Sequence, residues 1–279
     1  MPNFLSRWLP GLAPALLLCS LAAVAQTQPA EDVPFITSPD NVTLEMLRIA
    51  NVSSGDHVID LGSGDGRIVI QAARRFGATG LGVEIDPQLV TRSVRNATAA
   101  GVAERVEFRV QDLFLTDLSP ATVITMYLLP EFNLKLRPAL LALKPGTRLV
   151  SHDWDMGDWQ PEQTTVVPVP DKAVGLEKSS KVHLWVVPAR VEGLWCGTGL
   201  LRGTALELSQ RYQMLGGSLR RNDRSRAIDG RIRGTALLVA AGRNGELGLE
   251  FVGNELRITS AQGELALARG QTFRRAGAC

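Results

Sequence analysis

The sequence is poor in cysteine and nearly balanced in charge. Its 279 residues include three Cys, with no C-x-x-C pair and no H-E-x-x-H segment, so we expect no metal centre. Lys and Arg number 30 against 28 Asp and Glu, and a net charge of +2 does not favour nucleic acid as a partner. Hydrophobic residues make up 45%, which excludes a disordered or low-complexity chain.

Long hydrophobic runs are also missing. The longest begins near the N-terminus, where Arg7 is the one charge in thirty residues and Ala15–Ala25 is apolar apart from one serine. This run is shorter than the about 20 residues that a transmembrane helix needs. Ala23-Val24-Ala25 supplies the small residues of a cleavage site, so residues 1–25 are predicted to be a signal peptide. We expect export to the periplasm and a mature chain without a transmembrane segment; an uncleaved anchor is the alternative.

Removal of that peptide would leave two cysteines, Cys196 and Cys279. An even number of cysteines in an oxidising compartment favours a disulfide, which here would close a loop of about 84 residues. Two unpaired thiols are the alternative.

Strands and helices alternate between residues 31 and 189, which predicts an α/β domain with a parallel sheet covered by helices on both faces. The expected strands are Asp56–Asp60, Gly80–Ile85, Val106–Val110, Ala121–Leu129 and Arg148–Asp153, followed by a closing hairpin of Thr164–Pro168 and Lys181–Val187. The expected helices are Arg67–Phe76, Pro87–Ala100 and Leu134–Leu143.

Residues 190–279 have a different sequence pattern, in which short segments of alternating apolar and polar residues recur about every ten residues. Glycine-containing turns such as Gly216-Gly217 separate them, and Glu264–Arg269 is expected to be the last strand. This spacing predicts an all-β antiparallel barrel or sandwich. The segment has 14 Arg, no Lys and 8 acids, or +6. This charge suggests contact with an anionic envelope component, or merely a soluble surface.

A glycine-rich turn lies between the first strand and the first helix of the α/β domain. Val58–Arg67 reads VIDLGSGDGR, and its glycines let a ligand approach the backbone N–H groups at a helix N-terminus. Glu84 follows at the end of the second strand, where a carboxylate can accept both hydroxyls of a ribose. Asp112 follows the third strand and is placed to accept from an adenine amino group, with Leu113 or Phe114 beside the ring. All three meet at the carboxyl edge of the sheet, near its switch point.

Residues 33–187 resemble the seven-stranded, class I S-adenosylmethionine-dependent methyltransferases. The resemblance rests on the glycine spacing G-x-G-x-G and on the segments GVEIDP and VQDLF. The resemblance implies a Rossmann-like methyltransferase sheet. It implies that the glycine turn cradles the methionine part, Asp60 holds its amino group, Glu84 the ribose and Asp112 the adenine. The candidate cofactor-binding residues are Thr37, Asp60, Gly62, Ser63, Gly64, Asp65, Gly66, Glu84, Ile85, Asp112 and Leu113.

A narrower resemblance rests on the Pro-Phe-x-Thr-x-Pro segment at 34–39 and on Tyr127–Pro130. Together with DLGSGDGRIVI, they are similar to the small protein-lysine methyltransferases related to the mitochondrial inner-membrane enzymes. That family implies a lysine ε-amine, and hence a protein, as the methyl acceptor. Val191–Trp195 resembles the start of lipocalin-like barrels.

The acceptor would lie at the ends of the fourth and fifth strands. Tyr127 could orient an amine by its ring or hydroxyl, Pro130 follows it, and Asp153 could hold the amine or accept its proton. His152 and Asn133 are further polar groups on this rim, each with a purely structural alternative. Three other functions stay open: a non-catalytic nucleoside-binding scaffold whose β-barrel is an interaction module, a small-molecule methyltransferase and, weakest, a nicotinamide dehydrogenase.

Overall fold

The computed structural model describes residues 36–172, 177–241 and 245–279. The predicted signal peptide lies outside the described residues. Among the described residues, no helix is both long and apolar enough to cross a bilayer.

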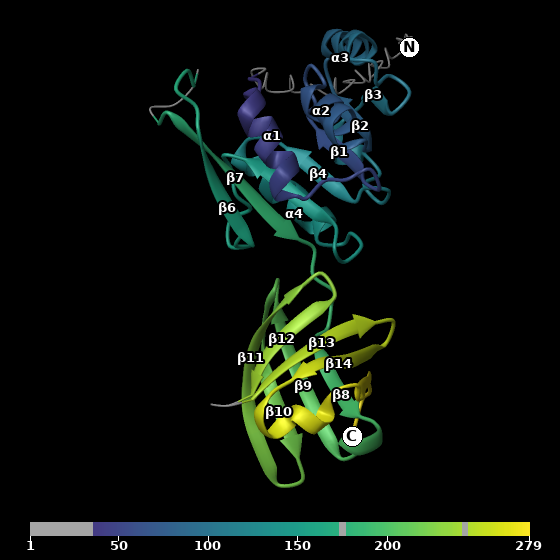
Figure 1. Ribbon diagram of the computed structural model, residues 1–279, viewed down its shortest axis with the longest axis vertical. Helices are drawn as coiled ribbons and strands as arrows, with labels where there is room; N and C mark the ends of the chain where they lie inside the picture. Colours follow the sequence, from purple (N-terminus) through teal and green to yellow (C-terminus); the bar gives the residue numbers. More distant parts are fainter. Residues whose placement is uncertain (1–35, 173–176, 242–244) are drawn as a thin grey trace, which may run out of the picture. The chain divides into compact units, whose positions relative to one another are not determined.

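Seven strands form one sheet in the order β3-β2-β1-β4-β5-β7-β6 (Figure 1). They are β1 His57–Leu61, β2 Thr79–Glu84, β3 Val106–Val110, β4 Val123–Met126, β5 Arg148–His152, β6 Gln163–Pro168 and β7 Ser179–Val186. Strands β1 to β5 are parallel, whereas β7 is antiparallel to β5 and to β6. The α/β fold is confirmed, and the strand order reverses between β1 and β4, where such sheets bind ligands.

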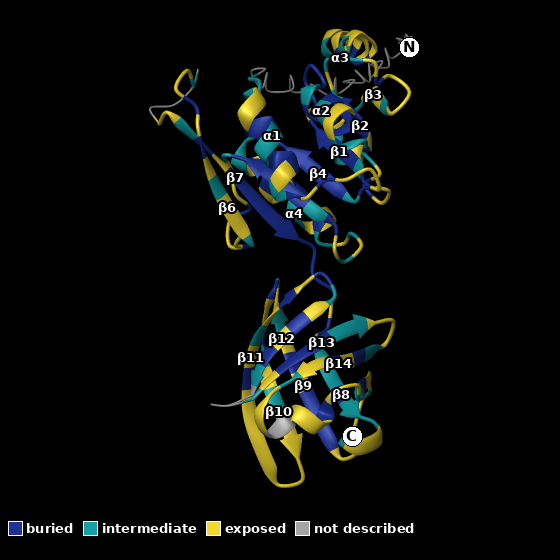
Figure 2. Ribbon diagram, in the orientation of Figure 1, coloured by how far each residue is buried: buried dark blue, intermediate teal, exposed yellow. Residues whose placement is uncertain are grey.

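Helices cover both faces of this sheet, and its central strands are therefore buried on both sides. They are α1 Asp40–Ile49, α2 Arg67–Phe76, α3 Pro87–Ala99 and α4 Pro130–Leu140, with a 3₁₀ turn η1 at Leu113–Leu115. One apolar core joins α1 and α2 to alternate residues of β1, β4 and β5, and a second joins α4 to the intervening residues. In Figure 2, β1 and β4 are accordingly dark blue.

The helices differ from the sequence expectation in one additional helix and in the bounds of α4, which is Pro130–Leu140 rather than Leu134–Leu143. The additional helix is α1. Proline suits the first turn of a helix, where its missing N–H would have no partner. Three residues, 127–129, separate the fourth strand from this helix, and Pro130 is the first residue of the helix.

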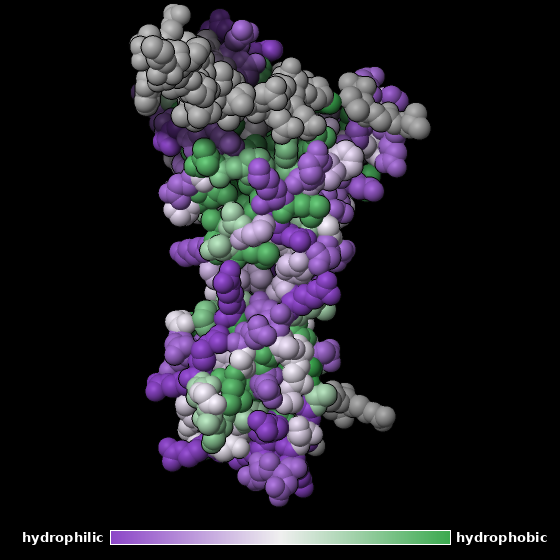
Figure 3. Space-filling view, turned by 180° about the vertical axis from the view of Figure 1, so that it is seen from behind, coloured by the Kyte–Doolittle hydropathy of each residue, from purple (hydrophilic) through white to green (hydrophobic). Residues whose placement is uncertain are grey.

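Eight strands form a closed antiparallel barrel, which confirms the all-β prediction. They are β8 Gly193–Gly197, β9 Thr204–Arg211, β10 Met214–Arg221, β11 Arg224–Arg233, β12 Ala236–Ala241, β13 Glu246–Val252, β14 Glu255–Ala261 and β15 Thr272–Arg275, with 3₁₀ turns η2 Gly199–Leu201 and η3 Gly263–Ala268. Trp195, Leu206, Ile232 and Phe273 belong to its apolar interior. Between these inward residues, polar side chains face outward, and the visible face of the barrel mixes hydrophilic with hydrophobic residues (Figure 3).

Two details of the barrel prediction are wrong. The segment Glu264–Arg269 is not a strand, because most of it lies in η3, and the eighth strand is β15. Its Glu, Leu and Ala residues are good helix formers, which outweighs the short alternation. Gly216-Gly217 is not a turn but lies within β10; the chain turns earlier, at Tyr212, whose φ is +54°.

A disulfide joins Cys196 on β8 to Cys279, so the paired alternative is the observed one. The two residues are 83 apart in sequence, and both belong to the barrel half of the chain. The bond thus ties β8 to the segment that follows β15, next to the pairing of these two strands.

Replacing both Cys196 and Cys279 by serine is expected to lower the free energy of unfolding of the barrel by about 4 kcal/mol, because the unfolded chain regains the entropy of an open loop of about 84 residues. Guanidinium unfolding followed by near-ultraviolet circular dichroism measures the change. An unaltered midpoint would contradict this expectation. Ligand binding to the α/β sheet should be preserved in the variant, which serves as the control for its folding.

Candidate active site

The glycine-rich turn after β1 is held in left-handed backbone. Gly62, Gly64 and Gly66 have φ values of +74°, +54° and +80°, a region that residues with a Cβ rarely adopt. The N–H groups of Gly62 and Ser63 both donate to the carbonyl of Val83 at 2.9 Å, which fixes the turn against β2. Gly66 is the N-cap of α2, which begins at Arg67. The turn therefore presents its backbone beside a helix N-terminus, as the sequence pattern predicts.

Glu84 links this turn to the end of β2. Its Oε2 accepts from the N–H of Gly64 at 3.0 Å, and its Oε1 accepts from Ile85 and Asp86 at 2.8 and 3.1 Å. These bonds aim the carboxylate at the carboxyl edge of the sheet. Ile85 beside it is 66% exposed, which leaves an apolar side chain free to cover an aromatic ring.

Asp60 lies buried at the end of β1, where Oδ1 accepts from Thr125 Oγ1 at 2.7 Å. Burial raises the pKa of this carboxyl to about 7; the Thr125 bond acts against the rise, and the charges of Glu84 and Asp65 add to it. Burial and the charges of Glu84 and Asp65 therefore keep the Asp60 carboxyl partly protonated near pH 7. A cationic ligand group beside Asp60 would favour the ionised form of this carboxyl.

Ser63 contributes an unpaired polar atom at the same turn. Its side chain is buried, and its Oγ has no hydrogen-bond partner within the described structure. A buried hydroxyl without a partner is unfavourable. The adjoining Gly82 keeps the space tight, since a Cβ there would lie 2.7 Å from Ser63 Oγ. The turn thus has the polar atom and the close backbone that a bound amino acid moiety requires.

Asp65 and Asp112 are each engaged by their own neighbours. The Asp65 carboxylate forms an ion pair with Arg67 at 2.7 Å, and Arg67 also donates to the Ser38 carbonyl. Asp112 is exposed at the end of β3 and caps η1 by accepting from the Phe114 N–H at 2.8 Å, with Leu113 as the first residue of that turn. Their direct contact with a cofactor stays a prediction.

Tyr127 stacks on His152 at the ends of β4 and β5, with 3.9 Å between ring centroids. His152 is buried, and hydrogen bonds to Ser38 Oγ at 2.8 Å and Ser180 Oγ at 2.9 Å fix its ring. Burial is the main cause that lowers the His152 pKa to about 4, so the imidazole is neutral at pH 7. His152 therefore supports the Tyr127 ring from beneath.

Asp153 follows with a left-handed backbone at φ +61°. Its Oδ1 accepts from the Lys181 N–H at 2.9 Å, and its Oδ2 lies 2.8 Å from Lys172 Nζ. Burial acts to raise the Asp153 pKa, but the bonds from Lys172 and Lys181 outweigh it and hold the pKa below its usual value. This carboxylate is suited to holding a cation and is a weak base.

Three further predicted residues surround this rim. Asn133 is buried on α4 and donates to the carbonyls of Trp154 and Asp155, which shapes the loop after β5. Pro130 starts that helix, and Thr37 is half-buried next to Ser38. The structure thus brings the Thr37 segment to β5 through the Ser38–His152 bond. Contacts of Pro130 and Thr37 with a ligand stay predictions.

Sequence reasoning missed Ser38, Arg67, Lys172 and Ser180. Ser38 lies within the Pro-Phe-x-Thr-x-Pro segment already noted, so that motif could have indicated it. Lys172 and Ser180 come from the β6–β7 hairpin region and carry no local signal. Among the described residues, no group of three or more His, Cys, Asp or Glu side chains could hold a metal ion.

The reversed seventh strand, the three-glycine turn and the acidic strand ends define a class I S-adenosylmethionine-dependent methyltransferase. Residues 60–163 match the family described as the ANTKMT methyltransferase domain. A protein-lysine N-methyltransferase of Saccharolobus islandicus (strain REY15A) is 43% identical over 157 residues, which cover 56% of this chain and 94% of that protein. The chain belongs to this methyltransferase family.

Two other relatives add detail. The adenine nucleotide translocase lysine N-methyltransferase of Mus musculus is 31% identical over 130 residues, covering 46% of this chain and 56% of that protein. The crystal structure of an RNA methyltransferase from Salinibacter ruber with S-adenosyl-L-homocysteine is 51% identical, with a TM-score of 0.50, and covers 56% of this chain and 96% of that one. The cofactor of this chain is S-adenosylmethionine, and the dehydrogenase alternative falls away.

The affinity for S-adenosylmethionine is expected to rise about 20- to 30-fold between about pH 5.5 and 7.5 and then to level off. The Asp60 carboxyl, with its pKa raised to about 7, must lose its proton to pair with the cofactor's ammonium group, so binding releases a proton and strengthens as the pH rises. Calorimetric titration across this range measures the effect. The Asp60→Asn variant should show weaker binding with a flat profile, and a flat profile in the unaltered protein would refute the assignment.

Proposed function

We propose that this enzyme methylates the ε-amine of a lysine in a protein. The observation that carries the proposal is the pairing of Asp153 with a lysine: Lys172 Nζ lies 2.8 Å from Oδ2, beside the Tyr127–His152 stack. A lysine ammonium is therefore already accommodated on the rim where the acceptor is expected. The names of the Saccharolobus and mouse relatives support the same acceptor class.

Once bound, S-adenosylmethionine would supply a methyl group that its positive sulfur activates. The lysine ammonium first loses a proton to bulk water, the neutral amine then takes the methyl group, and S-adenosylhomocysteine leaves. The protein positions the two reactants and excludes water from the site. Asp153 holds and orients the amine, and its low pKa means that it does not take the proton. Tyr127 offers its ring to the cationic product, since methylated ammonium groups favour aromatic faces.

RNA is the second candidate acceptor, because the Salinibacter structure is named an RNA methyltransferase. One experiment separates the two: incubation of the purified chain with tritiated S-adenosylmethionine and a cell extract, followed by protease or ribonuclease. We expect the label to resist ribonuclease, to disappear with protease and to map to trimethyl-, dimethyl- or monomethyl-lysine by mass spectrometry. Ribonuclease-sensitive label would assign RNA instead.

We also infer export of this enzyme to the periplasm. The composition of residues 1–25 and the Cys196–Cys279 disulfide support this location, since structural disulfides persist in oxidising compartments. Fusing residues 1–30 to an alkaline phosphatase that lacks its own signal should give active phosphatase. Replacing the apolar run's Leu16-Leu17-Leu18 with three glutamates should abolish it. An inactive unaltered fusion would contradict export.

We also propose that the Arg-rich barrel contacts an anionic component of the envelope. Its charge of +6 supports this proposal.

A further inference from the structure

Arginines occupy the inward face of the barrel near the β10–β11 hairpin. On β10 and β11, the inward positions begin with buried Leu215, Ile228 and Ile232. Alternate residues of a strand lie on the same face, so the inward face also includes Arg221 on β10 and Arg224 and Arg226 on β11. The inward surface therefore changes from apolar to cationic toward this end of the barrel.

The strand register places two of these arginines side by side. Arg221 lies directly opposite Arg224, and on its other side opposite Thr204 on β9. Like charges in directly opposed positions destabilise an antiparallel pair. Both arginines are exposed, so solvent reduces this cost, but the row of Thr-Arg-Arg brings two guanidinium groups together at one end of the barrel.

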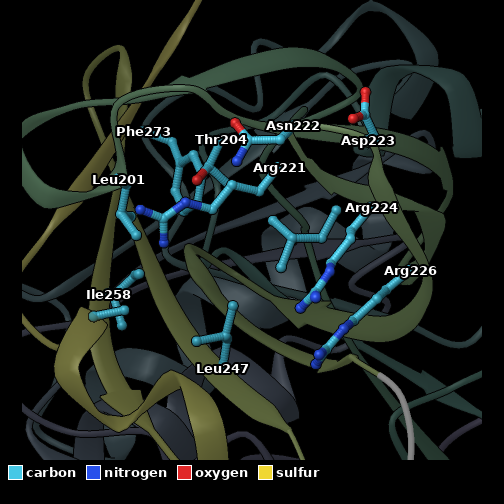
Figure 4. Close-up of a pocket in the computed structure, with 12 residues that line it drawn as sticks. Leu201, Thr204, Arg221, Asn222, Asp223, Arg224, Arg226, Leu247, Ile258 and Phe273 are labelled. Atoms are coloured by element: carbon cyan, nitrogen blue, oxygen red, sulfur yellow. The ribbon is translucent and has the colours of Figure 1, made fainter.

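These residues line a cavity of about 530 Å³ (Figure 4). Its apolar wall includes Leu247, Ile258 and Phe273, all almost fully buried. Figure 4 shows Arg221 and Arg224 extending toward the cavity, whereas Asp223, the acidic residue among its lining, points away from it. The volume falls in the range of small-molecule sites, about 300–1,000 Å³.

Thr204 provides an independent sign of a ligand. It is 4% exposed, lines the cavity, and its Oγ1 has no hydrogen-bond partner within the described structure. A buried hydroxyl ordinarily finds a partner. An acceptor group of a ligand beside Arg221 would satisfy it.

We propose that this cavity binds an anionic amphiphile, with its acidic headgroup between Arg221, Arg224 and Thr204 and its apolar tail against Leu247, Ile258 and Phe273. Guanidinium groups pair well with carboxylate and phosphate, and the apolar wall gains from burying a hydrocarbon chain. The site lies in the barrel and is independent of methyl transfer. The ligand is either a free fatty acid or a single lipid of an anionic membrane, since both have this chemistry.

Titration of the full chain with dodecanoate, monitored by calorimetry, tests the proposal. We expect micromolar binding, at least tenfold weaker binding of the uncharged dodecanol, and no measurable binding of inorganic phosphate, which has no tail. Equal affinity for dodecanoate and dodecanol, or no binding of either, would overturn the proposal, and these comparisons need no variant.

Substitutions then locate the site. The double variant Arg221→Gln/Arg224→Gln should bind dodecanoate at least tenfold more weakly, and Thr204→Val should also lose affinity. Arg220→Gln, one position along β10 and outward-facing, is the matched control and should bind normally. Retained S-adenosylmethionine binding and thermal melting verify folding; unchanged dodecanoate affinity in a folded double variant would refute the site.

Flotation with vesicles of phosphatidylcholine, with and without phosphatidylglycerol, distinguishes the sources. Binding to the anionic vesicles that disappears in the double variant would assign a membrane lipid. Dodecanoate binding without flotation would assign a free amphiphile. Flotation equally strong in the double variant and in Arg220→Gln would contradict a lipid held in this cavity.

Discussion

The Asp153→Asn variant is expected to lower kcat/KM for a lysine acceptor by about 10- to 100-fold, because it removes a charge-assisted bond to the ammonium group, which contributes about 1.5–3 kcal/mol. Asparagine suits the test, since it tolerates the left-handed backbone at this position, φ +61°. It also retains an oxygen that can accept from the Lys181 N–H. Steady-state kinetics on the identified protein substrate measure the loss.

Lys172→Gln is the matched control for this variant. It removes the protein's own lysine from Asp153 and leaves the carboxylate free, so we expect activity to persist, with an equal or lower KM. S-adenosylmethionine affinity should be unaltered in both variants. If Asp153→Asn kept full activity, Asp153 would be a structural cap of the turn after β5; if it lost cofactor binding as well, the effect would be on the fold of the site.

Glu84→Ala is expected to weaken S-adenosylmethionine binding at least tenfold. The substitution removes the carboxylate placed for the ribose hydroxyls and also the acceptor for the N–H of Gly64, so the ligand contact and the turn are both affected. Calorimetric titration measures the change. Glu84→Gln, which keeps the size and one carbonyl oxygen, should show a smaller loss.

Glu107→Gln is the control for general effects of carboxylate removal, since Glu107 is an exposed residue on β3 that forms an ion pair with its neighbour Arg109. It should bind the cofactor normally. Unimpaired binding in a folded Glu84→Ala protein would show that this carboxylate does not hold the cofactor.

The cofactor side of the site could be predicted from the sequence because its signals are local. The turn needs glycine at Gly62, Gly64 and Gly66 for their positive φ values, and Glu84 sits where an apolar strand ends. Strand ends of a parallel sheet meet at one edge, so their order along the chain was sufficient to place them together.

The acceptor rim could be predicted only in part. Tyr127 and Asp153 follow strands, so the sequence could place both on this rim. Ser38 and His152 are 114 residues apart, and no local pattern indicates their bond. Lys172 reaches Asp153 only through the β6–β7 hairpin. Such contacts depend on how elements pack, and the same holds for η3, where alternation suggested a strand but helix-forming residues prevailed.

Closure of the barrel has a consequence for how the chain folds. Strand β8, the first of the barrel, pairs with β15, the last, so the cylinder cannot close before nearly all of its sequence is available for pairing. Pairings between such distant residues give a high contact order and slow folding. The α/β sheet can therefore form first, with barrel closure following and covalent pairing of Cys196 with Cys279 as the final step of maturation.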